Sequence, residues 1–263
     1  MIMKKMTLLL TVGMGISSTL AYGINITTKV ANQGTQISQV IGKEGVLSEE
    51  ETVAGLKNAL NTGVENAVKK LGVENGYFNE ASVKIFLPND AKRINEKNIK
   101  LIPGGKELVE KTILSMNRSA EDAVKLATPI FANAIAKMSF EDAKKILMGN
   151  DKAATEYFRK ATYSELKAAF MPKVKESLDK PLVANTSTAQ TWSLLTTKFN
   201  AVAKGPVGAV SGMQPVTTDL VNYTTDKTLE GLFLKLAEQE KVIRRNPAAR
   251  VNDIQKKVFG QLD

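Results

Sequence analysis

Neither cysteine nor histidine occurs anywhere in this chain of 263 residues. Without cysteine no disulfide can form, and the thiol that carries the lipid of a bacterial lipoprotein is missing. Without histidine the commonest general base is missing, and a Ser-His-Asp triad is excluded. The two absences together remove the usual ligand sets of zinc, copper and haem. Carboxylates could still bind calcium or magnesium, but the EF-hand spacing does not occur, and we expect no cofactor.

The apolar run at residues 6–16 is shorter than the roughly 20 residues that a membrane-spanning helix needs. Two lysines precede this run and small residues follow it, which is the pattern of a cleavable export signal. Cleavage after Ala21 and cleavage after Gly23 both satisfy the small-x-small rule. We predict a signal peptide at 1–23 and a periplasmic protein that is neither a lipoprotein nor an integral membrane protein.

Hydrophobic residues make up 43% of the chain and charged residues 24%, which is the composition of an ordinary globular protein. A chain of this length can bury roughly 70–75% of its unfolded surface, so a sizeable core is available. Residues 24–47 are rich in Thr, Asn and Gln and weakly patterned, which predicts a flexible N-terminal arm. We expect residues 48–263 to form a single helical domain.

The net charge is +9, and most of the positive excess lies near the C-terminus. This cluster favours an anionic envelope component or another periplasmic protein as partner, and nucleic acid is not expected in that compartment. The other interpretation is a solvated helix end whose cations complement the helix dipole. The segment 241–257 contains one acid, Asp253. Its basic residues are Lys241, Arg244, Arg245, Arg250, Lys256 and Lys257.

Apolar residues recur every three or four positions along almost the whole chain, which predicts helices. A capping box of Ser48 and Glu51 opens the first helix, and Gly72 stops it. Residues 83–87 alternate loosely before Pro88 and are expected to form an extended connector or a short strand. The predicted fold is an all-α, bundle-like domain of about eight to ten helices.

Capping residues predict four further helix starts. The starts are Thr128 before Pro129, Ser139 with Asp142, Thr162 with Glu165, and Asn246 before Pro247. Residues 204–215 form the main break, because they contain three glycines and two prolines. This break also contains three large apolar residues, so we favour a loop packed on the core over a lid.

The chemical motifs are weak. The pattern Ser-x-x-Lys at 164–167 and 177–180 matches the acyl-serine motif of penicillin-interacting enzymes, but the downstream Lys-Thr-Gly is absent. Acid pairs occur at 121–122 and 141–142, yet neighbouring positions on a helix diverge by about 100° and do not share one site. We therefore do not expect an enzyme.

Five segments, in this order along the chain, are similar to one known family. They are G-L-K-N-A-L at 55–60, S-M-N-R-S-A-E-D-A at 115–123, A-A-T-E-Y-F-R at 153–159, K-E-S-L-D-K at 175–180, and R-R-N-P-A-A-R at 244–250 leading to K-V-F-G at 257–260. Over about residues 52–260 the chain resembles the bacterial family filed as domain of unknown function 4197. The resemblance implies an exported, all-helical bacterial protein. It does not imply a particular activity, so no catalytic residue is carried over.

Six residues in these segments are our candidate contacts for a ligand or partner. Arg118, Arg159 and Arg250 could converge on a carboxylate or phosphate, which suits the bidentate geometry of guanidinium groups. The alternative is a salt-bridged helix face in which Arg118 pairs with Glu121 or Asp122. The six candidates are Asn117, Arg118, Arg159, Arg244, Arg245 and Arg250.

These observations predict a non-enzymatic binding or envelope-interaction module that uses the basic C-terminal helices. One alternative is a carrier that holds an apolar or amphipathic small ligand between helices, under the segment 205–215. A dry cavity of roughly several hundred cubic ångströms would be the signature of such a carrier. The second alternative is a hydrolase that uses carboxylates or the Ser/Lys pairs, and it requires titratable groups with perturbed pKa values in a cleft.

Overall fold

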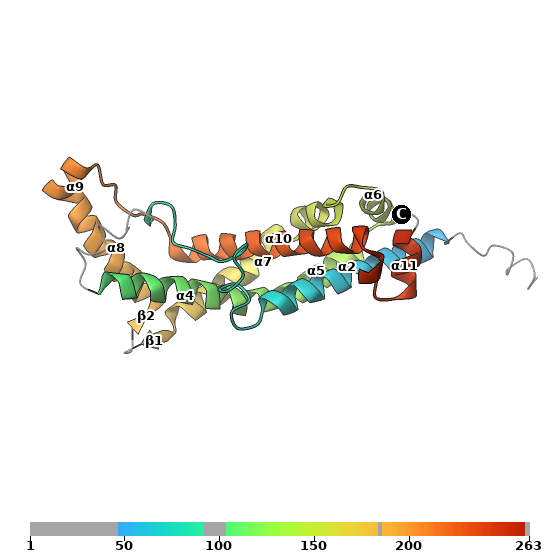
Figure 1. Ribbon diagram of the computed structural model, residues 1–263, viewed down its shortest axis with the longest axis horizontal. Helices are drawn as coiled ribbons and strands as arrows, with labels where there is room; N and C mark the ends of the chain where they lie inside the picture. The colour runs from blue at the N-terminus through green and yellow to red at the C-terminus, as the bar shows by residue number, and fades with distance from the viewer. Residues whose placement is uncertain (1–46, 92–103, 184–185, 261–263) are drawn as a thin grey trace, which may run out of the picture. The chain divides into compact units, whose positions relative to one another are not determined.

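The computed structural model describes residues 47–91, 104–183 and 186–260 (Figure 1). The predicted signal peptide and nearly all of the predicted N-terminal arm lie outside these residues. The described part of the chain belongs to one structural unit, Leu47–Asp263. Within it, no helix has both the length and the apolar character needed to cross a membrane.

The fold is all-α, as the sequence predicted. The α-helices are α2 (Glu49–Leu71), α4 (Gly105–Ala123), α5 (Ala127–Lys137), α6 (Phe140–Leu147), α7 (Ala153–Asp179), α8 (Thr188–Lys204), α9 (Pro206–Ser211), α10 (Leu220–Arg245) and α11 (Asp253–Gly260). Two short 3-10 helices join them, η2 (Val124–Leu126) and η3 (Pro247–Ala249). Two short strands, β1 (Pro181–Val183) and β2 (Thr186–Ser187), pair antiparallel before α8.

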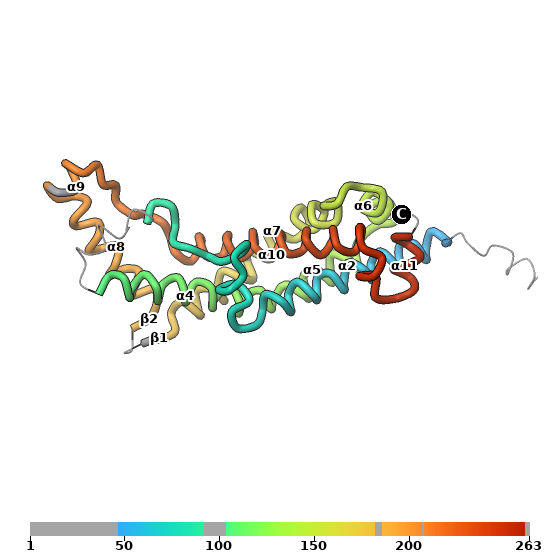
Figure 2. The backbone as a smooth tube through the Cα atoms, viewed as in Figure 1, coloured from blue at the N-terminus to red at the C-terminus, as the bar shows by residue number. Residues whose placement is uncertain are grey.

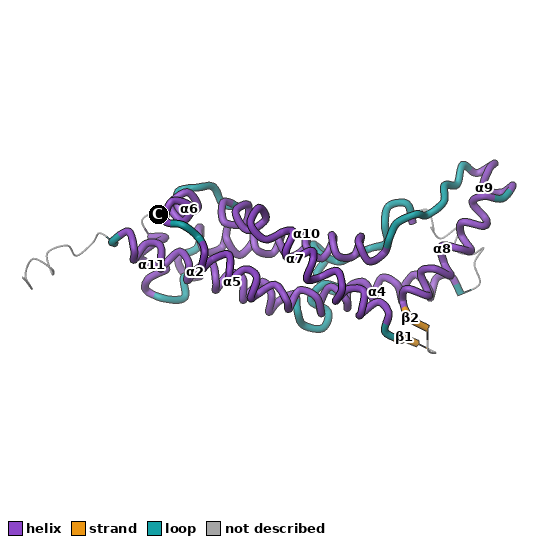
Figure 3. Tube along the Cα trace, turned by 180° about the vertical axis from the view of Figure 1, so that it is seen from behind, coloured by secondary structure: helices purple, strands orange, loops and turns teal. Residues whose placement is uncertain are grey.

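The two longest helices, α7 and α10, are each about 40 Å long. They pack against each other from Thr155 beside Glu240 to Lys167 beside Asp226, so the first half of α7 makes the contact (Figure 1). Helices α4 and α5 pack against α7, and α2 packs against α5, α6, α10 and α11 (Figure 3). The buried side chains of these helices form one core, which includes Phe131, Phe158, Phe170 and Phe233. Phe131 contacts Phe158 and Phe233 edge to face, which is a favoured arrangement of aromatic rings.

Several helix starts follow the predicted capping chemistry. Ser48 and Glu51 form the capping box of α2, and the Ser139 hydroxyl accepts a hydrogen bond from the Asp142 backbone at the start of α6. Asn246 caps η3, so the stretch after α10 is a 3-10 turn followed by α11. These local signals were sufficient because each cap satisfies backbone N–H groups that have no partner within the helix.

Two predicted starts are wrong. Thr162 lies inside α7, where its hydroxyl donates to the Phe158 carbonyl and so cannot cap a helix. The helix also continues through Pro172. Helix α5 begins at Ala127, directly after η2, so Thr128 does not precede its first turn. In both places the chain is already helical before the predicted start.

The predicted extended connector is confirmed. Residues 84–88 form neither helix nor strand, and their side chains alternate as in an extended chain. Val83, Ile85 and Leu87 are buried, whereas Phe86 is 51% exposed. We call residues 83–88 the connector. Figure 2 shows that it runs beside the N-terminal half of α10.

The segment 204–215 differs from the prediction of a loop packed on the core. It contains α9, which packs against α8 and ends at Gly212 in the left-handed conformation. Val210 is 91% exposed, whereas Met213 packs partly against the core. The apolar residues of this segment therefore do not all face the interior.

Candidate functional site

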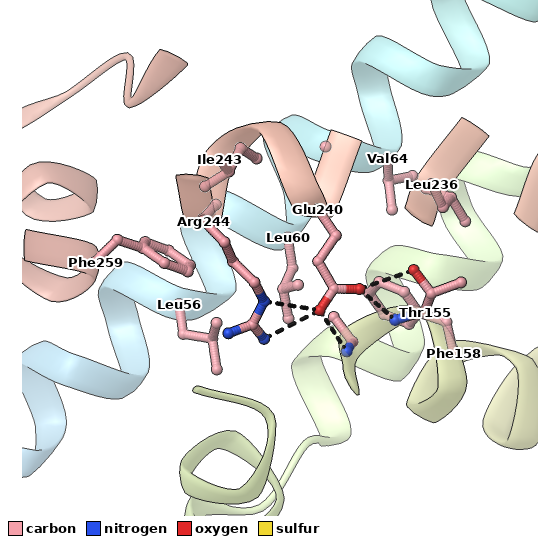
Figure 4. A pocket seen from close by; sticks show the side chains of 13 residues that line it. Leu56, Leu60, Val64, Thr155, Phe158, Leu236, Glu240, Ile243, Arg244 and Phe259 are labelled. Atoms are coloured by element: carbon pink, nitrogen blue, oxygen red, sulfur yellow. Dashed lines mark hydrogen bonds and ion pairs between the residues drawn. The ribbon is translucent and has the colours of Figure 1, made fainter. Parts of the chain in front are cut away.

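Arg244 is buried and belongs to an ion pair that joins three helices (Figure 4). Its guanidinium contacts Glu240 one turn earlier on α10, at 3.0 Å. The same group donates to the carbonyls of Ile146 and Leu147 at the end of α6. A cation at the C-terminal end of a helix is favoured by the helix dipole, so Arg244 fastens α6 to α10.

Glu240, the partner of Arg244, connects α10 to the start of α7. Its carboxylate accepts hydrogen bonds from the backbone N–H groups of Ala154 and Thr155 and from the Thr155 hydroxyl, at 2.8–2.9 Å. The carboxylate thereby caps the first turn of α7. Because both oxygens are fully engaged, Glu240 is placed as a structural clamp and not as a general base.

The space beside this clamp is small. The cavity among α2, α7, α10 and α11 measures about 30 Å³ and is lined mainly by apolar side chains such as Leu60 and Phe158 (Figure 4). A volume of this size holds about one or two water molecules. It is far below the several hundred cubic ångströms that the carrier hypothesis predicts, and it does not lie under residues 205–215.

The other predicted arginines near the C-terminus also have partners within the chain. Arg250 is buried, and its guanidinium donates to the carbonyls of Ile243 and Arg244 at the end of α10. Arg245 forms a bidentate pair with Asp151 at 3.0 Å and lowers the pKa of that carboxyl group. Much of the C-terminal positive charge therefore stabilises the fold. Arg245 and the three lysines of the cluster are exposed, and Arg245 is engaged with Asp151.

Asn117 is fully buried on α4, and its side chain forms hydrogen bonds with the backbone of the connector. Its side-chain oxygen accepts from the Ile85 backbone N–H at 2.9 Å, and its amide nitrogen donates to the Ile85 carbonyl at 2.8 Å. This exchange of two hydrogen bonds is what a neighbouring antiparallel strand would provide. Asn117 therefore positions the connector.

Arg118, next to Asn117, is bound by the turn after α2. Its guanidinium pairs with Glu121 at 2.6 Å and with Glu74 at 3.0 Å. The Glu121 carboxylate in turn accepts from the backbone N–H groups of Tyr77 and Phe78. Burial raises the pKa of the Tyr77 phenol, and the Glu121 charge raises it further. Arg118 therefore belongs to a salt-bridged helix face, which was the alternative to ligand binding, and its partner on α4 is Glu121.

The three arginines do not converge. Arg118 is held by Glu74 and Glu121 beside the turn after α2, whereas Arg159 lies over the ring of Phe233 on α10, 4.4 Å from its centre. Arg250 binds at Ile243, which is about 15 Å further along α10 than Phe233. The three guanidinium groups therefore occupy three separate places.

The predicted hydrolase groups are also engaged with other residues. Lys167 pairs with Asp226 at 2.6 Å, and this hydrogen bond raises the pKa of the lysine, which is opposite to the shift that a general base needs. Lys180 pairs with Glu176. Across the described residues, no group of three or more acids is placed to hold a metal ion.

A larger hollow lies between the connector and α10, and we call it the connector groove. Its volume is about 350 Å³, which is within the range of ligand sites. Gly231 allows α10 to lie close to Tyr77 and Val83. A side chain at this position would clash, because its Cβ atom would lie 2.8 Å from the Tyr77 ring and 3.1 Å from Val83. The groove is lined by Ser82, Val83, Lys84, Ile85, Phe86, Leu87, Asn89, Tyr223, Lys227, Glu230, Gly231 and Leu234.

The walls of the connector groove combine apolar and charged groups. Phe86 and Leu234 are exposed apolar side chains. Lys227 and Glu230 pair with each other at 2.5 Å. The sequence predicted the connector but not the groove. The other wall of the groove is α10, which lies about 140 positions later in the chain, and the spacing of apolar residues in α10 does not indicate that it packs beside the connector.

The comparisons with known proteins give one match. A family model described as "Protein of unknown function (DUF4197)" matches residues 46–260. This agrees with the resemblance found in the sequence. Neither the comparison with curated proteins nor the one with solved structures gave a match.

Proposed function

Because this chain belongs to the family described as "Protein of unknown function (DUF4197)", which names no activity, we propose a function from the geometry: a binding module of the bacterial periplasm that holds a partner in the connector groove. The observation that carries the proposal is the groove itself, where extended backbone lies between the exposed ring of Phe86 and Lys84, a lysine that forms no ion pair with the described residues.

The charges of the chain support a binding role over a catalytic one. The acids and lysines near α7 and α10 form ion pairs that lower the pKa of Asp151 and raise the pKa of Lys167. Both shifts favour the charged form and so stabilise pairs, whereas catalytic groups are tuned toward neutrality near pH 7. The basic C-terminal cluster supports the role less than the groove does, because three of its arginines have partners within the chain.

Site-specific photo-crosslinking in living cells tests this proposal. A photoreactive amino acid replaces Phe86 in the full chain, and a matched probe replaces Leu194, which is 45% exposed on α8. We expect a discrete crosslinked species from position 86 and none from position 194. Equal patterns at both positions, or no species at position 86, would contradict a binding site in the groove.

Export is tested on the same cells. Osmotic shock should release the protein, and the mass of the released chain should correspond to cleavage after Ala21 or Gly23. Retention of the intact chain inside the cell would contradict the periplasmic part of the proposal.

A further inference from the structure

Resting on the proposed function, we propose that the connector groove binds an extended peptide segment of a partner protein. The segment adds as a parallel strand to the edge formed by Lys84 and Phe86, and it carries a carboxylate that pairs with the Lys84 ammonium. This inference names the kind of partner and the mode of its binding.

The first step concerns the direction of the backbone groups. In an extended chain the N–H and C=O of one residue point to one edge, and those of the next residue point to the opposite edge. Both groups of Ile85 bind Asn117 on α4. The groups of Lys84 and Phe86 therefore face the other edge. The Tyr223 hydroxyl of the groove lies nearest the Phe86 carbonyl, at 3.0 Å, and 3.4 Å from the Leu87 carbonyl, so the end of this edge borders the groove.

The second step concerns which groups are open. Lys84 N–H donates to the Glu80 carbonyl, and the Phe86 carbonyl accepts from Tyr223. No hydrogen bond to the Lys84 carbonyl or from the Phe86 N–H occurs among the described residues. An acceptor on one residue and a donor two residues later match a single residue of a parallel strand, which donates to the first and accepts from the second. Pro88 ends this edge, since it has no N–H.

The third step concerns the side chains that would recognise the segment. Lys84 Nζ lies 3.8 Å from the centre of the Phe78 ring and 5.8 Å from that of Phe86, and no carboxylate of the described residues pairs with it. Neighbouring charges are already neutralised, because Lys227 pairs with Glu230. A carboxylate beside Lys84 would complete the pairing, and an apolar side chain would cover Phe86 and Leu234.

Addition of a strand to an open edge is a common way for a protein to bind a peptide, with backbone hydrogen bonds giving affinity and side-chain contacts giving specificity. The edge here is held in place before binding, because Asn117 fixes one side and Gly231 allows close contact of the connector with α10. Little ordering cost therefore remains for the protein.

The test uses a displayed library of random heptapeptides, selected on the purified mature protein. Enriched peptides are synthesised, and each backbone nitrogen is methylated in turn. We expect the enriched sequences to combine an acid with an apolar residue. Methylation at one nitrogen should weaken binding about tenfold, the equivalent of one lost hydrogen bond, while methylation at either neighbour should change it little.

Two protein variants and one amide provide independent readouts. K84E should weaken binding of the acidic peptides about tenfold or more, whereas K198E, the same charge change at an exposed lysine on α8, should not. Hydrogen exchange at the Phe86 amide should slow when peptide binds. Neither substitution alters a buried residue, and the exchange measurement uses the wild-type chain, so the results do not reflect misfolding.

The outcomes separate the inference from the proposed function. A peptide that binds without slowing exchange at Phe86, or whose methylation pattern shows no single sensitive nitrogen, overturns strand addition while crosslinking at position 86 still supports a groove site. Selection that yields no peptide, with a crosslinked partner that proves to be a lipid, a small molecule or a second copy of this chain, overturns the peptide inference. Absence of crosslinking overturns the proposed function.

Discussion

Two adjacent arginines on α10 make ion pairs that differ in burial. The Arg244 side chain is 6% exposed and pairs with Glu240, whereas the Arg245 side chain is 70% exposed and pairs with Asp151. A buried charge that loses its partner is strongly destabilising, while surface pairs contribute little. The same chemistry therefore has different consequences at neighbouring positions.

We expect Glu240→Ala to lower the free energy of unfolding by about 3–5 kcal/mol, because it leaves Arg244 buried without its anion and the first turn of α7 uncapped. Asp151→Ala should cost about 1 kcal/mol or less. Urea-induced unfolding of the two variants measures the difference. Equal costs would mean that the clamp contributes no more than a surface pair.

Glu80 predicts how stability depends on pH. Hydrogen bonds from Lys70, Ser82 and Lys235 lower the pKa of Glu80 from 4.5 to about 2. Because the pKa is lower in the folded chain, the stabilisation is fully present above pH 4.5 and is lost as the pH falls through about 2. Solvent screens this site, so we expect its contribution to be about 1 kcal/mol.

Unfolding in urea at pH 6 and pH 2.5 should show a larger loss in the wild type than in Glu80→Gln, which has no carboxylate to titrate. Glu65→Gln serves as the control, since Glu65 is an exposed acid of α2 that forms no ion pair with the described residues. If Glu80→Gln loses as much stability as the wild type on acidification, Glu80 is not a source of the pH dependence.

At the scale of the elements, two asparagines hold two non-helical segments in the same way. Asn117 exchanges two hydrogen bonds with Ile85, and Asn200 on α8 does the same with Val216 after α9. Each side chain takes the place of a neighbouring strand. The two segments therefore keep extended backbone without belonging to a sheet.

Asn117→Leu should cost about 2–3 kcal/mol, because it leaves the buried N–H and C=O of Ile85 without partners. Hydrogen exchange should speed up at Ile85 and remain unchanged at Val216. Asn200→Leu is the matched control and should give the reverse pattern. Faster exchange at both sites in either variant would indicate general unfolding and contradict the separate roles.

The elements also show how far sequence patterns reach. The capping box of Ser48 and the cap at Ser139 were predictable, because both depend on residues three positions apart. The same kind of pattern at Thr162 was misleading, since a threonine hydroxyl inside a helix can bond to the carbonyl one turn earlier. Local spacing does not distinguish the two uses.

At the scale of the whole molecule, the partners of charged residues could not be predicted. The basic C-terminal cluster was visible in the sequence, but its arginines bind Asp151 and the ends of α6 and α10. Those partners lie up to about 100 residues away, and no periodicity gives their position. The connector groove was missed for the same reason, although the extended character of its first wall was predicted.

Helix α10 contacts α2, α4 and α7, so its removal should expose the core of all three. We expect a chain that ends at residue 219 to show no cooperative thermal transition by circular dichroism. A chain that ends at residue 252 lacks only α11 and should retain a cooperative transition at a lower temperature. A cooperative transition in the shorter chain would show that the remaining helices form a core without α10.

The late position of α10 has a consequence for the time course of folding. Synthesis delivers roughly 5–20 residues per second, so the earlier helices wait for several seconds before the helix that covers them exists. The Glu240 clamp, which fixes the first turn of α7, therefore forms only after all of α7 has been made. For the export proposed above, this delay would be an advantage, because the chain would stay unfolded enough to pass through a channel until α10 has been made.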